Sequence, residues 1–164
     1  MSDQVQVRLA EPGDLAAVGD ITVRGYGHDG YITDEDDYVH ELADSAGRAA
    51  AAEVYVALRD GKVVGTVTFC PPGSPLRELS RDGEGEFRML AVDPEARRLG
   101  VGGALVRHCF DRCGQLDLTS MVICSMTTMT TAHALYAAIG FERDPALDWQ
   151  PVPGVTLWAF RASV

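Results

Sequence analysis

The chain of 164 residues alternates between short β-rich runs and longer stretches whose apolar residues recur at helical spacing. The runs typical of strands are residues 3–10, 53–70, 86–94, 120–126 and 154–162. The run 53–70 is divided by Asp60-Gly61, which favours a tight turn and therefore predicts two antiparallel strands. Pro94 ends the following strand, because proline has no backbone N–H to donate.

The stretches between these strands have the spacing of amphipathic helices. The predicted helices run through Leu15, Val18 and Ile21, through residues 33–52, from Arg97 onward, and through Ala132, Leu135, Tyr136 and Ile139. Thr33 can cap the second of these helices, and Gly140 closes the last. Helices interleaved with strands, with hairpins at one end, predict an α/β (α+β) fold on a mixed sheet, not an open doubly wound sheet.

The third predicted helix opens on RRLGVGGALV, residues 97–106, with two arginines and three glycines. Gly102 and Gly103 each cost a helix interior about 1 kcal/mol relative to alanine. The free N–H groups of a first helical turn bind anions, and glycine lets phosphate oxygens come close. The stretch therefore favours a polyphosphate site. Close packing of the helix against the sheet, with solvated arginines, is the alternative that the glycines leave open.

Two familiar phosphate-binding patterns do not fit this stretch. The Walker pattern fails because no Gly-Lys-Ser/Thr follows. The dinucleotide fingerprint fails because Leu105 occupies its third glycine position and DPEARR separates the strand from the glycines. If this stretch binds a polyphosphate, it does so with a different backbone arrangement.

Charge and hydropathy limit the classes of molecule with which the protein is expected to interact. The formal net charge of −10 opposes a phosphate backbone, so no nucleic-acid partner is expected, and an acidic surface would attract a cationic substrate. The sequence shows no basic leader with an apolar run and no apolar stretch long enough to cross a bilayer. One cytoplasmic domain spanning residues 1–164, without a membrane partner, is therefore expected.

The cysteines do not indicate a metal site or a disulfide frame. They show neither a CxxC pair nor the spacing of a zinc module, and they are expected to be small buried thiols. The four residues are Cys70, Cys109, Cys113 and Cys124.

Two segments carry a family resemblance. LAVDPEARRLGVGGAL, residues 90–105, and ALYAAIGFER, residues 134–143, resemble the acyl-CoA signature and the distal helix of the GNAT N-acetyltransferases. Residues 97–102 fit that family's Q/R-x-x-G-x-G/A loop. The resemblance implies a GNAT fold with a mixed central sheet of six to seven strands and about four helices, splayed between the fourth and fifth strands.

Acetyl-CoA, as the acyl-donor cosubstrate, is the cofactor that the resemblance implies. Its pyrophosphate would sit on backbone N–H groups at the helix start with help from an arginine, and its pantetheine arm would pair with the strand backbone. The residues implied are Leu90, Ala91, Val92, Arg97, Arg98, Leu99, Gly100, Val101, Gly102 and Gly103.

The resemblance also assigns catalytic roles. An amine must lose its proton to attack a thioester, and the leaving thiolate gains from a proton donor. Glu86 matches the family's general base, with Glu84 as the substitute, and Tyr136 matches the general acid. A solvated carboxylate and a core tyrosine are the plain alternatives. His133 could point at the same cleft, although an exposed position is the plainer expectation.

One position departs from the family pattern, and one region is left for the acceptor. Met129 stands where many GNATs place an asparagine that binds the cofactor, and neighbouring threonines could replace its hydrogen bond or cap the helix. Acid and aromatic residues in YGHDGYITDEDDY could hold a cation, or could simply begin a helix. The tentative substrate residues are Tyr26, Tyr31, Asp34 and Tyr38.

These observations predict an enzyme that moves an acetyl group from acetyl-CoA to a primary amine by direct attack. A catalytically silent acyl-CoA-binding module and a structural domain whose glycines serve packing are the rivals. The acceptor, a small-molecule amine or a protein amine, is left open. Dimerisation is common among similar proteins, and no sequence feature decides for or against a homodimer.

Overall fold

The computed structural model describes residues 4–31 and 37–164. The strands are β1 (Gln6–Leu9), β2 (Glu53–Arg59), β3 (Lys62–Cys70), β4 (Glu84–Val92), β5 (Ser120–Met126), β6 (Glu142–Arg143), β7 (Trp149–Val152) and β8 (Val155–Ser163). The α-helices are α1 (Leu15–His28), α2 (Tyr38–Ala43), α3 (Ser45–Ala51), α4 (Val101–Gln115) and α5 (Thr130–Ile139). The strands form a mixed sheet in the order β1-β2-β3-β4-β5-β8-β6, and β7 pairs with β8.

The β2–β3 hairpin confirms the turn predicted at Asp60-Gly61. Both residues have positive φ, 51° and 75°. Two consecutive positive φ angles match the right-handed twist of the flanking strands, and aspartate followed by glycine tolerates them. The two strands pair antiparallel along their length.

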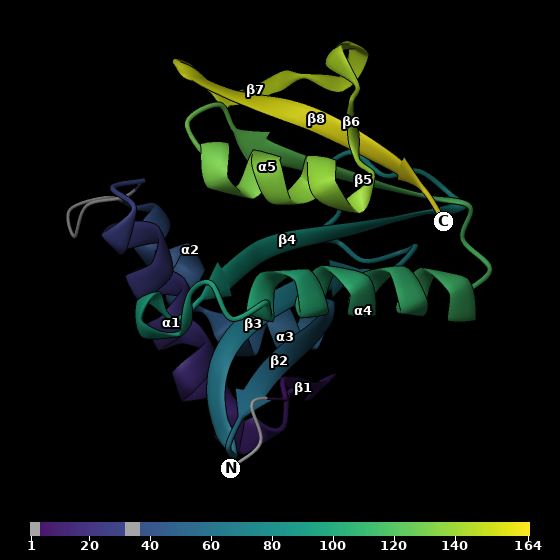
Figure 1. Ribbon diagram of the computed structural model, residues 1–164. Helices are drawn as coiled ribbons and strands as arrows, with labels where there is room; N and C mark the ends of the chain where they lie inside the picture. Colours follow the sequence, from purple (N-terminus) through teal and green to yellow (C-terminus); the bar gives the residue numbers. More distant parts are fainter. Residues whose placement is uncertain (1–3, 32–36) are drawn as a thin grey trace.

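Helices cover both faces of the sheet. Val54 and Val56 of β2 pack against Val18 of α1, whereas Tyr55 between them belongs to the core cluster that includes α4 residues such as Leu105. This alternation places α1 and α4 on opposite faces, because successive side chains of a strand point in opposite directions. Figure 1 shows α4 running along the sheet beneath β4, with α1 and α2 near one end. None of the described helices combines the length and apolar character needed to span a membrane.

The second predicted helix is divided in two. Asp44 lies between α2 and α3 with ψ 65°, outside helical geometry, and its carboxylate accepts a hydrogen bond from the N–H of Gly47 at 3.0 Å. A short carboxylate side chain can satisfy the first amides of a new helix, so it ends one helix and caps the next. Thr33, the predicted cap, lies outside the described residues.

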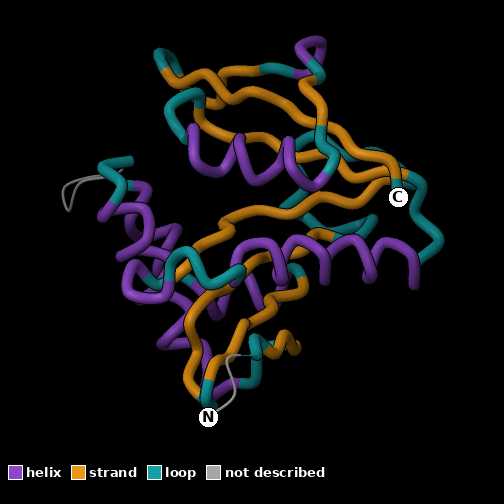
Figure 2. Tube along the Cα trace, viewed as in Figure 1, coloured by secondary structure: helices purple, strands orange, loops and turns teal. Residues whose placement is uncertain are grey.

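The sheet opens between β4 and β5, as the resemblance predicts. These parallel strands pair at Glu84 with Ser120 and at Gly85 with Met121, and no further pair joins them among the described residues. Beyond that point they diverge, and Figures 1 and 2 show β4 leaving the group formed by β5, β7 and β8. The crossover between them is α4, which carries its N-terminus to the open end.

Some boundaries and counts differ from the sequence prediction. The sheet has eight strands because β6 and β7 join it. β6 is two residues long, and β7 is four residues long and contains Pro151, so neither carries a strand pattern. The helix predicted from Arg97 begins at Val101, because Arg98 and Gly100 adopt positive φ of 66° and 79°. It ends at Gln115, one residue past the predicted Gly114.

Candidate active site

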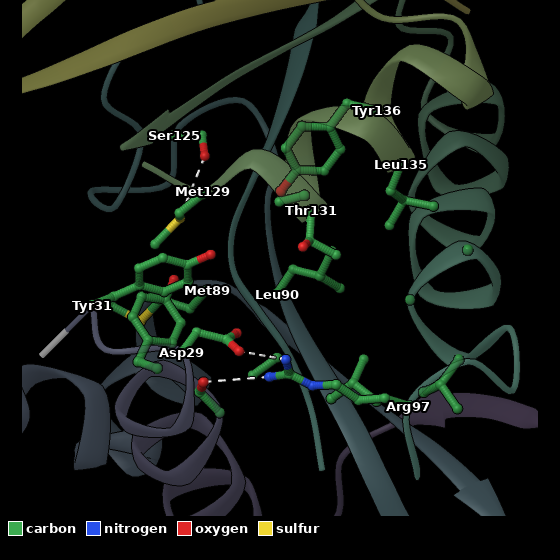
Figure 3. A pocket seen from close by; sticks show the side chains of 18 of the residues that line it. Asp29, Tyr31, Met89, Leu90, Arg97, Ser125, Met129, Thr131, Leu135 and Tyr136 are labelled. Atoms are coloured by element: carbon green, nitrogen blue, oxygen red, sulfur yellow. Dashed lines mark hydrogen bonds and ion pairs between the residues drawn. The ribbon is translucent and has the colours of Figure 1, made fainter. Parts of the chain in front are cut away.

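A cavity of about 500 Å³ fills the opening between β4 and β5. Its walls are the divergent half of β4, the N-terminus of α4, the end of α1, and residues of β5 and α5. Figure 3 shows it from close by, with Leu90 and Met89 from β4 on one side and Tyr136 and Leu135 from α5 on the other. A ligand here would lie between two strands that no longer pair with each other.

The residues that begin α4, 100–103, line the mouth of this cavity. The N–H of Ala104 donates to the carbonyl of Gly100 at 3.0 Å, which is the first hydrogen bond of the helix. The backbone N–H groups of residues 101–103 lie before it, in the first turn, where a helix offers them no carbonyl partner. A Cβ on Gly100 would meet nothing within 4 Å, and one on Gly102 would approach Leu135 Cδ2 at 3.2 Å. The absence of a side chain at Gly102 therefore keeps the cavity mouth open and also lets α4 approach α5 closely.

The two predicted arginines have different surroundings. The Arg97 guanidinium donates to Asp29 Oδ1 at 2.6 Å and to the carbonyl of Gly25 at 3.4 Å, which ties the loop to the end of α1 (Figure 3). Arg98 is exposed and has no hydrogen bond or ion pair within the described part of the chain. Arg98 is therefore the arginine that can turn to an anion at the mouth without breaking an existing pair.

The β4 backbone is irregular where the cavity begins. Met89 has φ 54°, and the pairing of β4 with β3 shifts register between Thr66 and Thr68. An extra residue in one strand bends it and leaves backbone groups outside the ladder. Of the residues implied for the cofactor, Leu99 does not line the cavity and is 43% exposed. Those that do line it are Leu90, Ala91, Val92, Arg97, Arg98, Gly100, Val101, Gly102 and Gly103.

Tyr136 lies in the wall of the cavity with its ring in the core. The residue is 6% exposed and packs edge-on against Phe87, Phe141 and Phe160. Within the described part of the chain its hydroxyl has no hydrogen-bond partner, and Figure 3 shows it directed toward the cavity. Burial raises the pKa of Tyr136 well above its usual range. The group therefore holds its proton and is free to donate it.

A second cavity of about 550 Å³ continues the first toward α2 and the β7–β8 turn. Seven residues line both cavities: Tyr26, Tyr31, Arg88, Met89, Cys124, Ser125 and Met129. We call the first the cofactor half and the second the acceptor half of one cleft. The predicted substrate residues Tyr26, Tyr31 and Tyr38 all line the acceptor half, and Asp34 lies outside the described residues.

The structure places Glu86 away from this cleft. Its side chain is fully buried, and its carboxylate accepts hydrogen bonds from the N–H groups of Glu78, Leu79 and Ser80 at 2.9, 2.9 and 2.8 Å. It lines neither half of the cleft. This carboxylate therefore holds the segment 78–80 against β4 and does not face a bound amine directly.

The other polar candidates also have partners. Glu84 bonds Arg161, Ser120 and the N–H of Arg81 where β4 and β5 still pair, outside the cleft. His133 is partly buried rather than exposed, and its Nε2 lies 3.1 Å from the hydroxyl of Ser125. Through Ser125, His133 contacts a residue of the cleft without lining it.

Residues around the expected asparagine position divide between the cleft and the surface. Met129 lines both halves of the cleft, and its sulfur accepts a hydrogen bond from Ser125 at 3.4 Å. All three neighbouring threonines are exposed; Thr131 lines the cofactor half (Figure 3), whereas Thr128 and Thr130 line neither half. Of the neighbouring threonines, Thr131 is therefore the one placed to replace the missing amide.

Three charged residues that the sequence did not single out line the acceptor half, Glu41, Glu78 and Arg88, and Arg88 also lines the cofactor half. Glu78 and Arg88 form an ion pair, with 2.9 Å between the carboxylate and Nε. Burial raises the pKa of the Glu78 carboxyl above its ordinary value, although Arg88 acts in the opposite direction. Arg88 stands two positions after Glu86 on β4, and this spacing is only a weak sequence signal for a site residue. Glu78 lies in a loop without periodicity, so no sequence pattern could have identified it.

Comparison with known proteins gives a family and several relatives. The Acetyltransferase (GNAT) family model matches residues 17–141. N-acetylaspartate synthetase from Xenopus tropicalis is 30% identical over 102 residues, which are 62% of this chain and 35% of that protein. An uncharacterized N-acetyltransferase from Schizosaccharomyces pombe is 32% identical over 95 residues, 58% of this chain and 54% of that protein. The matches therefore span about a third to a half of these relatives.

Solved structures share the fold over nearly the whole chain. The PaiA N-acetyltransferase from Thermoplasma acidophilum, in complex with coenzyme A, has a TM-score of 0.79 at 11% identity, covering 98% of this chain and 99% of that one. YncA from Salmonella typhimurium, with its cofactor acetyl-CoA, has a TM-score of 0.68 at 21% identity, covering 98% and 94%. At such identities the likeness establishes the fold alone.

Proposed function

Because this chain belongs to the GNAT acetyltransferase family, we propose that it transfers an acetyl group from acetyl-CoA to a primary amine by direct attack. One observation carries the proposal: the cleft joins the α4 N-terminus, the divergent β4 backbone and the Tyr136 hydroxyl in one continuous space, and this hydroxyl has no hydrogen-bond partner among the described residues. An acyl donor and an amine could meet in it without a covalent intermediate on the protein.

The residues present fit coenzyme A. The amides of residues 100–103 and the guanidinium of Arg98 would hold the pyrophosphate, since a helix N-terminus favours anions. Backbone groups of Leu90 to Val92 would pair with the pantetheine arm where β5 no longer does. When bound, acetyl-CoA supplies an activated thioester carbonyl.

Proton removal from the amine is assigned to Glu78, with Glu86 in a supporting role. Glu78 lines the acceptor half, and its raised pKa makes it a stronger base than an ordinary carboxylate. Glu86, predicted as the base, accepts the backbone N–H of Glu78 itself. We therefore propose that Glu86 is a positioning residue that keeps Glu78 in the cleft.

Tyr136 is proposed as the general acid. Its hydroxyl would donate to the sulfur as the carbon–sulfur bond breaks, which offsets the charge developing on the thiolate. Cys124 also lines the cleft, but burial raises the pKa of its thiol to about 12. A thiol that keeps its proton is a poor nucleophile, and this supports direct attack by the amine.

Replacing Tyr136 with phenylalanine tests the proposal. We expect Tyr136→Phe to lower kcat about a hundredfold or more, because the ring packing stays and only the donor is lost. Release of coenzyme A from acetyl-CoA in the presence of a broad amine panel gives the rate. Tyr55→Phe is the matched control, because Tyr55 bonds Glu53 at 2.6 Å and lines neither half of the cleft.

The outcome also separates the enzyme from its rival. A silent acyl-CoA-binding module would bind coenzyme A in calorimetry and show no thioester loss with any amine. Equal rates for the wild type and Tyr136→Phe would remove the tyrosine from the mechanism. Acetylated product with at least one amine, lost in Tyr136→Phe and kept in Tyr55→Phe, supports the transferase.

A further inference from the structure

The acceptor half contains a buried guanidinium whose terminal nitrogens are weakly engaged. The Arg88 side chain is 16% exposed, and its shortest ion pair runs from Nε to Glu78 at 2.9 Å. The Tyr38 hydroxyl is a further hydrogen-bond partner of this side chain. The Arg88 Nη1 is 3.5 Å from the carbonyl of Leu76, and its Nη2 is 3.6 Å from Glu41. Hydrogen bonds to charged groups are normally well under 3 Å, so these two contacts are weak.

The weak contact with Glu41 is also easy to exchange. The side chain of Glu41 is 56% exposed on α2, so water can solvate it when it leaves Arg88. A planar guanidinium presents a fork of N–H donors that matches the two oxygens of a carboxylate. An incoming carboxylate can therefore take the terminal nitrogens of Arg88 while Glu78 keeps Nε.

The neighbouring Glu78 supplies the opposite charge at the same place. An α-amino acid carries its ammonium and its carboxylate on one carbon, so it can meet a carboxylate and a guanidinium that lie side by side. An amine without a carboxylate would bring a second positive charge next to Arg88 and leave its fork unfilled. The Glu78–Arg88 pair therefore fits a zwitterion better than a simple cation.

Beside these charged residues, the acceptor half has a large apolar and adaptable part. Three methionines there have flexible side chains that adjust to irregular shapes. Val152 and Val155, at the β7–β8 turn, are 54% and 38% exposed, so a ligand could cover apolar surface there. The apolar lining residues are Met89, Met126, Met129, Pro151, Val152, Val155 and Leu157.

We propose that the acceptor is an α-amino acid with an apolar side chain, held by its carboxylate on Arg88 and by its ammonium on Glu78. This rests on the proposed acetyl transfer and names its substrate class. The ammonium first gives one proton to Glu78, which passes it to solvent. The free amine then bonds to the acetyl carbon, the carbon–sulfur bond breaks, and the second proton that leaves the nitrogen is balanced by the one that the thiolate gains. The products are an N-acetyl amino acid and free coenzyme A.

Matched acceptors test the carboxylate. L-leucine and L-phenylalanine are compared with isopentylamine and phenethylamine, which are the same molecules without the carboxylate. We expect kcat/KM to be about tenfold to a hundredfold higher for each amino acid, the size of a charge-assisted hydrogen bond. L-aspartate should be a poorer acceptor than L-leucine, because its second carboxylate would face the lining residues Asp37 and Glu41.

An arginine variant tests the residue. Arg88→Lys keeps the charge beside Glu78 and removes the planar fork. We expect it to raise KM for L-leucine and to lower kcat/KM for L-leucine more than for isopentylamine, so that the ratio between the two acceptors falls toward one. Arg112→Lys is the control, because Arg112 pairs with Glu53 at 2.8 Å and lines neither half. Thermal protection by coenzyme A shows that each variant is folded.

The possible failures are distinguishable. If the amines are acetylated as well as the matched amino acids, or if Arg88→Lys leaves the ratio unchanged, the substrate class is wrong and acetyl transfer stands. Preferred acetylation of L-aspartate would contradict the apolar side chain. If no acceptor is acetylated while coenzyme A binds, the proposed function and this inference fall together.

Discussion

Glu78 is a carboxylate whose surroundings act on its proton in opposite directions. Burial disfavours the charged form and raises its pKa, while Arg88 at 2.9 Å favours the charged form, and burial prevails. As a base the group must be deprotonated, so activity should fall as the pH falls through its pKa. Because that pKa is raised, the fall begins at a higher pH than an ordinary glutamate would give.

A pair of glutamine substitutions separates Glu78 from Glu86. Glu78→Gln should lower kcat/KM about a hundredfold and remove the acidic limb of the pH–rate profile. Glu86→Gln should instead lower the thermal midpoint, because an amide cannot accept the three backbone N–H bonds equally well, and should keep the acidic limb. Profiles of kcat/KM against pH and melting curves measure both. If Glu86→Gln loses the acidic limb and Glu78→Gln keeps it, Glu86 is the general base instead.

At the scale of elements, α4 combines a weak helix start with the proposed pyrophosphate site. The residues before it turn through positive φ at Arg98 and Gly100, so the helix begins abruptly with its first amides facing the cofactor half. β4 adds an irregularity at Met89 in its pairing with β3, beyond the point where its pairing with β5 ends at Gly85. The same irregularities that weaken local structure create the open space for a ligand.

Two glycines of α4 provide a matched test of this element. Gly102→Val should weaken coenzyme A binding about tenfold to a hundredfold, because a Cβ there already approaches Leu135 at 3.2 Å and branches would enter the cleft. Gly114→Val makes the same change in the same helix, where a Cβ meets nothing within 4 Å. Calorimetric titration measures both affinities. Equal affinities would contradict the pyrophosphate site.

At the scale of the whole molecule, a ligand in the cleft would join two parts of the sheet that pair at only two positions. β1 to β4 lie on one side of the opening and β5 to β8 on the other. The cavity walls come from both sides, so coenzyme A would contact β4, α4, β5 and α5 together. Binding should therefore stabilise the native state as a unit.

Thermal unfolding measures this effect. At a ligand concentration of one hundred times Kd, binding adds about 2.7 kcal/mol to the free energy of unfolding, provided only the native state binds. For a chain of this size that is a rise of about 5 to 10 °C in Tm. Pantetheine, the part of coenzyme A without its phosphates, should raise Tm much less at the same concentration. If coenzyme A does not change Tm, the glycines at the start of α4 have only a packing role.

The sequence by itself determined most of the elements and indicated the family. Asp60-Gly61 fixes the hairpin because positive φ is a property of those residues, and the glycines after Arg97 predict an anion-binding helix start because both signals are local. The GNAT resemblance of residues 90–105 and 134–143 gave the splayed sheet. Each of these inferences depends on residues close together in the chain.

Only the tertiary structure decided which side chains face the cleft. The loop at residues 78–80 has no periodicity, so nothing in the sequence shows that it covers Glu86 and turns Glu78 toward Arg88. Burial and charge pairing depend on distances between separate segments, and these exist only after β4, the loop and α2 have packed. The same packing removes water from the Glu78 carboxyl and leaves the Tyr136 hydroxyl unpartnered, which gives both groups the chemistry proposed here.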